Sequence, residues 1–231
     1  MPVIQDKEFG KITIRRSAKS TQVRVRVAPD GTLRASLPMH APLLLVKHLL
    51  KTSRNELKKI LAQASPNSIY EDGMQIGKSH TLVVQSIEKQ PFSIKTHGQQ
   101  IIVKIADKSQ LNDNQYARKI RDSIIAALRI EAKSYLPRRL SFLADKYKYS
   151  YERVRFSHAS GRWGSCSSNG TISLNIALMK LPFELIDYII IHELSHTKQM
   201  NHGPLFWKLV FEADPEYKSH RHALKLQNPS I

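Results

Sequence analysis

The sequence predicts an α+β protein: a β-rich N-terminal region, residues 1–112, with one inserted helix, and a C-terminal domain, residues 113–231, that carries a metal site. Three observations predict this arrangement. Short segments of the first region alternate apolar and polar residues, as half-buried strands do. From Arg118 onward apolar residues recur every four positions, as in an amphipathic helix. At His192 a His-Glu-x-x-His pattern has the spacing of a metal-binding helix.

Composition places the chain among globular proteins. Its 231 residues are 41% hydrophobic and can bury a sizeable core. The single cysteine, Cys166, excludes an internal disulfide framework and a cysteine zinc cluster, so histidines must supply any metal site and a reducing compartment fits best. The N-terminus lacks an apolar signal region, and no apolar run approaches the roughly 20 residues of a membrane span. We therefore predict a soluble, cytoplasmic protein with no membrane partner.

The first predicted element is a β-hairpin. Residues 23–27 alternate strictly between valine and arginine, residues 29–31 (Pro-Asp-Gly) are typical of a turn, and residues 33–37 resume the alternation. Arg24 and Arg26 form either the solvent face of a strand, which is the simpler explanation, or a ridge that contacts phosphate groups.

A helix and a second β segment follow. Residues 41–63, rich in Leu, Lys and Ala, predict one amphipathic helix, with the apolar run 43–46 in the core rather than in a membrane. Residues 81–84 and 101–103 predict strands, and His97-Gly98 predicts a turn before the second of them. The N-terminal region is therefore mostly β.

A change of character marks the predicted domain boundary. Residues 112–114 are polar and turn-prone. The apolar residues that follow at four-residue intervals predict one long helix: Ile120, Ile124, Leu128 and Ala132. We expect Pro137 to kink or divide this helix, because a proline inside a helix removes a hydrogen bond and clashes with the preceding turn.

Three short strands are predicted directly before the metal-binding pattern. They cover residues 153–156, 161–166 and 172–174, and Asn169-Gly170 has the composition of a tight hairpin turn. This order along the chain places a hairpin next to the metal-binding helix.

The metal-binding pattern itself requires a helix. If residues 183–199 are helical, His192 and His196 lie on one face, about 40° apart around the axis, with Glu193 beside them. Pro182 suits the start of such a helix, and the apolar residues before the pattern predict a buried, rigid element. Both imidazoles can then bind one metal ion.

A third ligand is expected just after this helix. Gly203-Pro204 ends the helix and allows a turn, so His202 can fold back as a ligand; Glu212 or Glu216 from a later helix are the alternatives. Three protein ligands and one open position are typical of catalytic zinc. Glu193 would then act as general base toward a water activated by the metal.

An ordered series of motifs fills the second half of the chain: residues 162–166, 172–175, 192–196, 201–207 and 214–218. This series resembles the YgjP-like metallopeptidase family. The resemblance spans most of the chain and is most specific after Arg153. It implies a zincin-like catalytic domain, made of a small sheet and an active-site helix, with zinc-dependent hydrolase activity. The SprT and WLM groups, which attack proteins attached to DNA, are similar around the same helix.

The resemblance also implies roles for individual residues. The family's three histidine ligands match His192, His196 and His202, and its general base matches Glu193. The ligand spacing equals that of metzincins as well, but Gln199 stands where they require glycine, so we do not place the chain among them.

The hairpin before the helix is a candidate wall of the substrate cleft, and four residues at it are candidate substrate-binding residues: Arg162, Trp163, Ser165 and Asn175. Arg162 either clamps an anionic group or oxyanion, or forms a structural ion pair. Trp163 is more simply a core residue than a substrate platform. Asn175 either supports the metal ligands or ends a strand in a turn. An edge strand here would pair with an extended peptide.

The net charge of +17, from 36 basic and 19 acidic residues, attracts polyanions but is spread along the chain. The leading prediction is a zinc-dependent (Zn²⁺) metallopeptidase that cleaves polypeptides. The alternative keeps the metal and hydrolyses the phosphoanhydride of a nucleotide. A third reading, a nucleic-acid-binding module with structural zinc, is the weakest, because a structural site has little use for Glu193.

Overall fold

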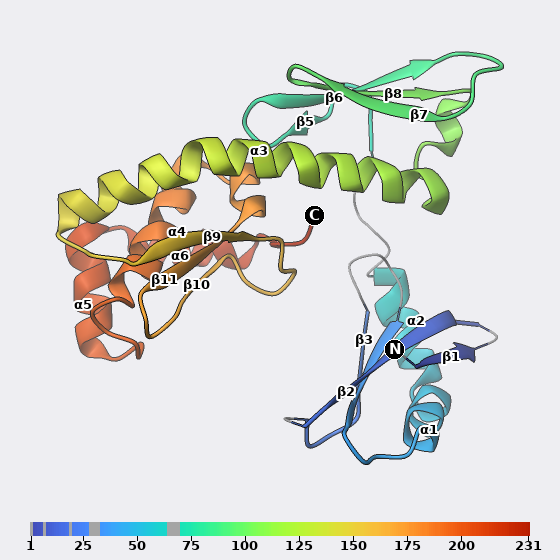
Figure 1. Ribbon diagram of the computed structural model, residues 1–231, viewed down its shortest axis with the longest axis horizontal. Coiled ribbons are helices and arrows are strands. Elements are labelled where there is room, and N and C mark those ends of the chain that lie inside the picture. The colour runs from blue at the N-terminus through green and yellow to red at the C-terminus, as the bar shows by residue number, and fades with distance from the viewer. Residues whose placement is uncertain (1, 7, 19, 28–32, 64–69) are drawn as a thin grey trace. The chain divides into compact units, whose positions relative to one another are not determined.

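The computed structural model describes residues 2–6, 8–18, 20–27, 33–63 and 70–231 (Figure 1). This part of the chain contains three sheets and six α-helices, which confirms the predicted α+β class. The chain forms two compact units, Met1–Ile69 and Tyr70–Ile231, and each has its own hydrophobic core.

A four-stranded sheet is the basis of the first unit. Its strands are β1 (Val3–Asp6), β2 (Gly10–Ser17), β3 (Arg24–Val27) and β4 (Leu33–Pro38), in the order β1-β2-β4-β3. β3 and β4 pair antiparallel, which confirms the predicted hairpin, while the turn predicted at residues 29–31 lies outside the described residues. β2 and β4 pair in parallel.

Two helices follow this sheet, where the sequence predicts one over residues 41–63. They are α1 (Leu44–Thr52) and α2 (Arg54–Gln63). The prediction that the apolar run 43–46 lies in the core is wrong for three of its four residues, because Val46 is fully buried whereas Leu44 is 71% exposed. Since a helix has 3.6 residues per turn, four consecutive side chains cannot all face one sheet.

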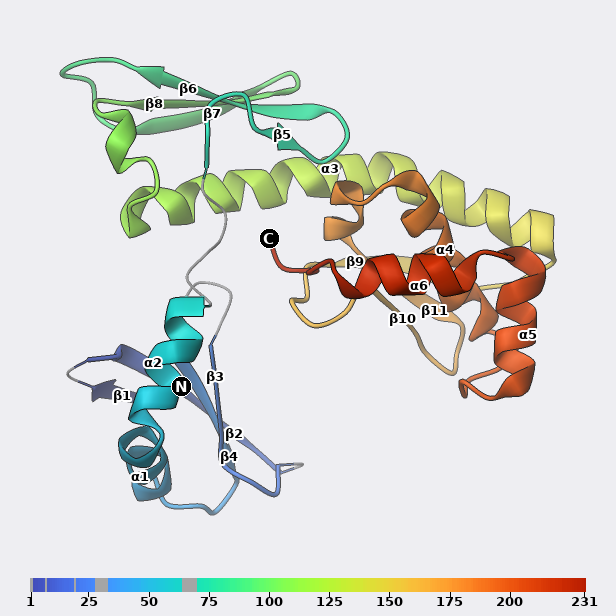
Figure 2. The ribbon, with the colours of Figure 1, turned by 180° about the vertical axis from the view of Figure 1, so that it is seen from behind.

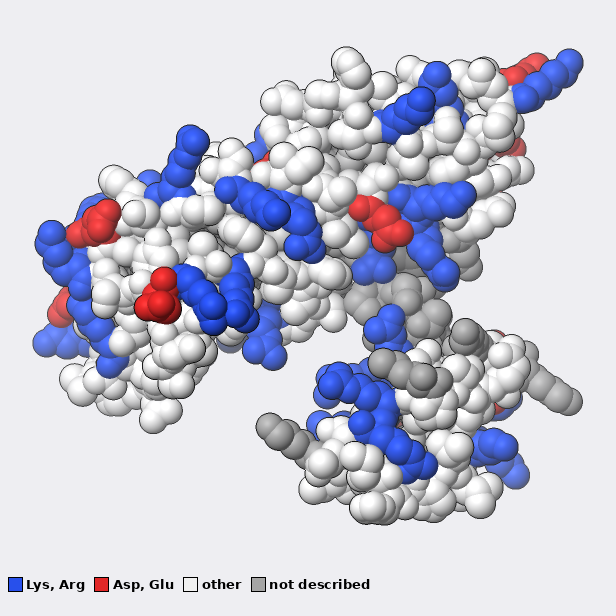
Figure 3. All heavy atoms as spheres, in the orientation of Figure 1, with Lys and Arg blue, Asp and Glu red and all other residues white. Residues whose placement is uncertain are grey.

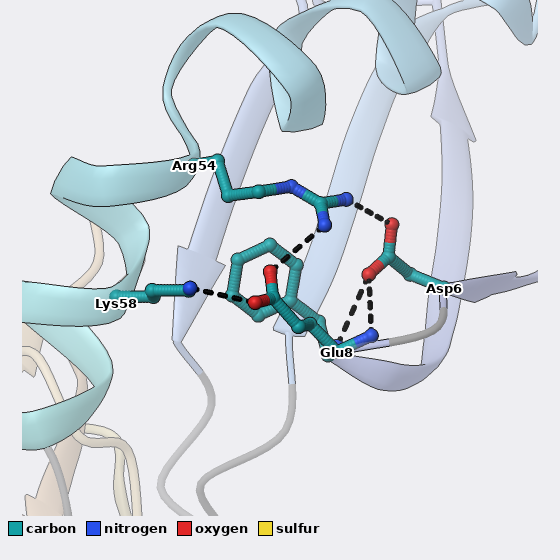
Figure 4. A network of polar contacts seen from close by, with 5 residues as sticks. Asp6, Glu8, Arg54 and Lys58 are labelled. Atoms are coloured by element: carbon teal, nitrogen blue, oxygen red, sulfur yellow. Dashed lines mark hydrogen bonds and ion pairs between the residues drawn. The ribbon is translucent and has the colours of Figure 1, made fainter.

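Ion pairs connect the β1–β2 turn to α2 (Figure 4). Arg54 lies 2.8 Å from both Asp6 and Glu8, and Lys58 lies 2.6 Å from Glu8. Hydrogen bonds from the backbone N–H of Glu8 and then of Phe9, with the charge of Arg54, outweigh burial and hold the pKa of Asp6 below its ordinary value. Such partly exposed pairs add little stability each, but they occupy both carboxylates of this turn.

The long helix α3 (Asn114–Tyr147) is the scaffold of the second unit (Figure 2). Its predicted four-residue repeat is confirmed, since the apolar residues of the repeat are all buried: Ile120, Ile124, Leu128 and Ala132. Pro137 lies inside α3, but the helix continues past it, so the expected division does not occur. The fully buried Leu136 and Leu140 on either side hold this stretch in the core.

One side of α3 packs against a four-stranded sheet (Figure 1). Its strands are β5 (Gln75–Ile76), β6 (His80–Ser86), β7 (Ser93–His97) and β8 (Gln100–Ile105), in the order β5-β6-β8-β7. The turn predicted at residues 97–98 is present, and it joins β8 to β7, a strand that was not predicted; Gly98 has a positive φ of 56° there. A 3₁₀ turn, Lys108–Gln110, leads from β8 toward α3.

The remaining elements carry the residues of the predicted metal site. A small sheet contains β9 (Arg153–Ser157), β10 (Gly164–Cys166) and β11 (Thr171–Asn175), in the order β10-β11-β9. A 3₁₀ turn (Ile176–Lys180) connects it to α4 (Phe183–Ser195), and α5 (Pro204–Ala213) and α6 (Tyr217–Lys225) follow. The predicted hairpin before the metal helix is therefore present as β10 and β11.

The chain divides into its two compact units between residues 69 and 70, whereas the sequence predicts a boundary between residues 112 and 113. The difference arises because the sheet β5–β8 packs against α3 and shares its core. The predicted boundary separates a β-rich region from the domain that holds the candidate metal site. As a boundary between two functional regions, it stays a prediction. Among the helices of the described residues, none has the length and apolar character needed to cross a membrane.

A buried carboxylate joins α3 to the β5–β6 turn. Glu131 is 7% exposed and accepts hydrogen bonds from the backbone N–H groups of Lys78, Ser79 and His80, from the Ser79 hydroxyl and from Nδ1 of His80. Gly77 is required beside it, because a Cβ there would lie 2.2 Å from Glu131 Oε2. Burial alone would raise the pKa of Glu131, but these hydrogen bonds outweigh it and leave the pKa below its usual 4.5.

We expect Glu131→Gln to lower the free energy of unfolding by about 2–4 kcal/mol, because the amide presents a donor to groups that themselves donate. The folded-state pKa is depressed, so this stabilisation is complete above the unfolded value and is lost as the pH falls through the folded value. Urea unfolding at neutral and acidic pH measures both effects. The exposed control Glu71→Gln should stay within about 0.5 kcal/mol of wild type at both.

Candidate metal centre

Helix α4 presents the first two histidines of the candidate site. Pro182 precedes its first turn, Glu184 lies in that turn, and the apolar residues that follow are buried. The helix ends at Ser195, four residues before the predicted end at 199, but His196 keeps helical backbone angles, with φ −65° and ψ −20°. His192 and His196 therefore still lie about one turn apart on one face.

Three imidazoles converge at the end of this helix. A turn brings His202 back, and one ring nitrogen from each of His192, His196 and His202 lies within 4.8 Å of the others. The ring centroids are 4.6–5.0 Å apart, and Nε2 of His202 lies 3.1 Å from Nε2 of His192. Among the described residues, neither Glu212 nor Glu216 belongs to such a group. The structure thus places His202 close to the other two histidines, and it places neither glutamate there.

The geometry and protonation of these rings fit a divalent metal ion. Two nitrogens bound to one tetrahedral zinc at about 2.0–2.1 Å each would be roughly 3.3 Å apart, close to the observed 3.1 Å between His192 and His202. Nδ1 of His196 lies 3.1 Å from the carbonyl oxygen of Gln199, which would orient that ring with Nε2 toward the centre. Nδ1 of His192 is buried without a hydrogen-bond partner among the described residues.

Burial keeps two of the imidazoles neutral. Burial, with smaller contributions from the neighbouring His196 and His202, lowers the pKa of His192 to about 3. Burial also lowers the pKa of His196. Neutral imidazole is the form that binds metal, so these rings are ready to bind a cation at physiological pH without first losing a proton.

One aromatic side chain supports all three rings. Phe206 of α5 is fully buried, and its ring centroid lies 4.9 Å from that of His192, 4.5 Å from that of His196 and 4.7 Å from that of His202. It fixes the ring positions by packing, without a polar contact. Phe206 is not among the site residues predicted from the sequence, although it follows the third histidine closely in the same motif.

Glu193 lies on the strand side of the site. Its side chain is 6% exposed and packs against Gly164 of β10. A Cβ at Gly164 would lie 2.7 Å from Glu193 Oε1 and 2.8 Å from its Cγ, closer than real Cβ contacts allow. Glycine is therefore required at this position to make room for the carboxylate, a role that the sequence analysis does not assign to it.

The ionisation of Glu193 depends on two opposing causes. Burial raises its pKa and the positive charge of Arg162 lowers it by a smaller amount, so that the pKa is about 8. A buried carboxyl group next to three imidazoles, with a pKa near neutral pH, is typical of catalytic acids and bases. Metal bound nearby would favour the carboxylate form further.

In metal-free protein, we expect Glu193→Gln to raise stability. Between its usual pKa of 4.5 and the folded value of about 8, the unfolded chain has released a proton that the folded protein still holds. The free energy of unfolding therefore falls as the pH rises through this window, and glutamine avoids that loss. Near neutral pH the variant should be more stable by about 2–3 kcal/mol. Urea unfolding across this pH range tests it, with Glu152→Gln as the exposed control; a difference that does not grow with pH contradicts it.

The four predicted substrate-binding residues take different positions. Arg162 is exposed, and its charge acts on Glu193. Trp163 is half-buried and packs against the core, and Ser165 is half-buried in β10. Asn175 is fully buried: its amide nitrogen donates to the carbonyl oxygens of Ala159 and Arg162 at 2.7 and 2.9 Å. We infer that Asn175 holds the loop that carries Arg162 rather than contacting a substrate.

Comparison with known proteins finds a family model and a solved structure that are similar to this chain. The family model described as YgjP-like, metallopeptidase domain matches residues 21–227. A crystal structure of the metallopeptidase zymogen of Pyrococcus abyssi abylysin is 31% identical over an alignment that covers 41% of this chain and 98% of that chain, with a TM-score of 0.36. No curated protein matches the sequence.

Proposed function

The chain belongs to the YgjP-like metallopeptidase family, and from this we propose that it is a zinc-dependent peptidase with the ligands His192, His196 and His202. The observation that carries the proposal is the convergence of these three imidazoles next to a buried carboxyl group, that of Glu193. A zinc ion held there would supply Lewis-acid activation of water and of the scissile carbonyl group. A site that would hold zinc with three protein ligands, as among the described residues, fits a catalytic rather than a structural role.

In the proposed reaction Glu193 moves the protons. Its carboxylate accepts a proton from the water whose oxygen attacks the scissile carbonyl carbon. The carboxyl group then donates this proton to the amide nitrogen as the C–N bond breaks, so the base is regenerated. Burial suits both steps, because a pKa near neutrality lets the same group accept and release a proton.

The neighbouring strand favours an extended polypeptide as substrate. β10 lies at the edge of its sheet and directly beside Glu193 through Gly164. A peptide that pairs with this edge would gain backbone hydrogen bonds with little dependence on its sequence. Arg162, in the loop just before β10, would stabilise the negative charge that develops on the carbonyl oxygen.

Zinc removal and replacement test this proposal. Protein treated with a chelator should lose hydrolysis of a labelled unfolded polypeptide, and added zinc should restore it. His196→Ala should lower zinc affinity by at least about 10-fold and remain inactive after zinc is added, because two remaining ligands hold the metal poorly. Release of phosphate or pyrophosphate from nucleoside triphosphates, measured in parallel, distinguishes the alternative hydrolase. Polypeptide cleavage that persists without metal contradicts the proposal.

A further inference from the structure

The two faces of the sheet in the first unit differ in chemistry. One face is apolar and packs with α1 and α2 in the core of the unit, through Ile12, Ile14, Leu33, Ala35 and Leu37. The residues that alternate with these along each strand lie on the opposite face, because successive side chains of a strand point to opposite sides. Both helices contribute their buried residues to the first face.

Arginines occupy the opposite face in two rows across three strands. In one row the paired neighbours are Arg15 of β2, Ser36 of β4 and Arg24 of β3. In the next row they are Thr13, Arg34 and Arg26 of the same strands. All four arginines are exposed, and Figure 3 shows Lys and Arg side chains gathered on this unit. We call this surface the arginine face.

The arginine face has the spacing and the groups that phosphates require. Neighbouring strands lie about 4.8 Å apart, so Arg15 and Arg24 are separated by roughly 10 Å, while Arg24 and Arg26 on one strand are about 7 Å apart. The hydroxyls of Ser36 and Thr13 lie in the same rows. Guanidinium and hydroxyl groups are common partners of phosphate oxygens.

Within the described residues, little neutralises the charge of three of these arginines. The side chains of Arg15, Arg24 and Arg26 make no hydrogen bond or ion pair with the residues that the structure describes. The carboxylates of the β1–β2 turn are held by the basic residues of α2. Residues 1–69 contain 13 Lys and Arg and 4 Asp and Glu, a net charge of +9 out of the chain's +17.

We propose that the arginine face binds the phosphate backbone of duplex nucleic acid without reading its sequence. Among the described residues, the apolar side chains on this face are Val3 and Pro38 at its margins, which offers little to insert into a membrane. No aromatic side chain lies in the rows to stack on unpaired bases. A duplex presents one charge per about 1.7 Å of its axis, so several phosphates fall within reach of the two rows.

Binding of a fluorescently labelled DNA duplex to the full chain, measured by anisotropy over a series of salt concentrations, tests the proposal. The logarithm of the association constant should fall linearly with the logarithm of salt concentration. In Arg24→Gln/Arg26→Gln the affinity at low salt should fall roughly tenfold or more, and the magnitude of the slope should fall by about 2, because two phosphate contacts are lost. A duplex of unrelated sequence should bind equally well.

The matched control, Lys47→Gln/Lys51→Gln, removes the same charge from exposed positions of α1, which packs on the other side of the sheet. It should retain most of the affinity. Both double variants should fold, with melting temperatures close to that of wild type, because all four substituted positions are exposed. Equal losses in the two variants would overturn the proposal. So would tighter binding to a single strand or to phosphatidylserine vesicles, or binding that does not depend on salt.

Discussion

Glu193→Gln is expected to lower kcat for peptide hydrolysis by about 10²–10⁴-fold while the protein keeps its zinc. Glutamine is nearly the same size as glutamate and fits against Gly164, so the position of the side chain should not change. It cannot accept a proton from water, however, and the attacking oxygen would then lack its base. The measurements are steady-state hydrolysis of an unfolded polypeptide and zinc content by mass spectrometry.

The matched control is Glu184→Gln, an exposed carboxylate in the first turn of the same helix. It removes the same charge from α4 and should leave kcat within about twofold of wild type. Loss of zinc in Glu193→Gln would show that Glu193 supports the metal rather than the proton transfer. Full activity with zinc retained would refute its role as base. Together with the expected gain in metal-free stability, lost activity would mark a residue kept for function at a cost in stability.

The helical part of this site could be predicted from the sequence because its geometry is local. The spacing of His192 and His196 follows from the pitch of one helix, and the Gly-Pro pair after His202 signals the turn that brings this residue back. The four-residue repeat of α3 could be predicted from the sequence equally well, since its apolar residues face a continuous core. Periodicity is reliable where one element determines the contact.

Contacts between distant segments could not be predicted in this way. Gly164 meets Glu193 only because β10 packs against α4, and Phe206 meets the three imidazoles only because α5 folds back on them. Likewise Arg24 and Arg26 alone look like an ordinary solvent face. The arginine face appears only when strand pairing brings Arg15 and Arg34 beside them. Periodicity within one segment does not encode which other segment it pairs with.

Gly164→Ala is expected to lower kcat by about 10²-fold or more with zinc still bound. The added Cβ would meet three atoms of Glu193 at 2.7–2.9 Å, so the glutamate side chain must turn away from β10. A displacement of about 1 Å in a reacting group can reduce a rate by 10²-fold. The stability cost should be small, about 1 kcal/mol, because a long side chain can change its rotamer. The three atoms nearest to the added methyl group all belong to Glu193, so we expect the three histidines to keep their positions.

Two comparisons make this prediction specific. Gly161→Ala adds the same methyl group three residues earlier, where nothing lies within 4 Å, and should leave kcat unchanged. In the double variant Gly164→Ala/Glu193→Gln, activity should fall no further than in Glu193→Gln alone, because both substitutions remove the same base. Additive losses would show that Gly164 acts on something other than Glu193, such as the pairing of β10 with a substrate. Non-additive losses with zinc retained would show that Gly164 of β10 acts by leaving space for the side chain of Glu193.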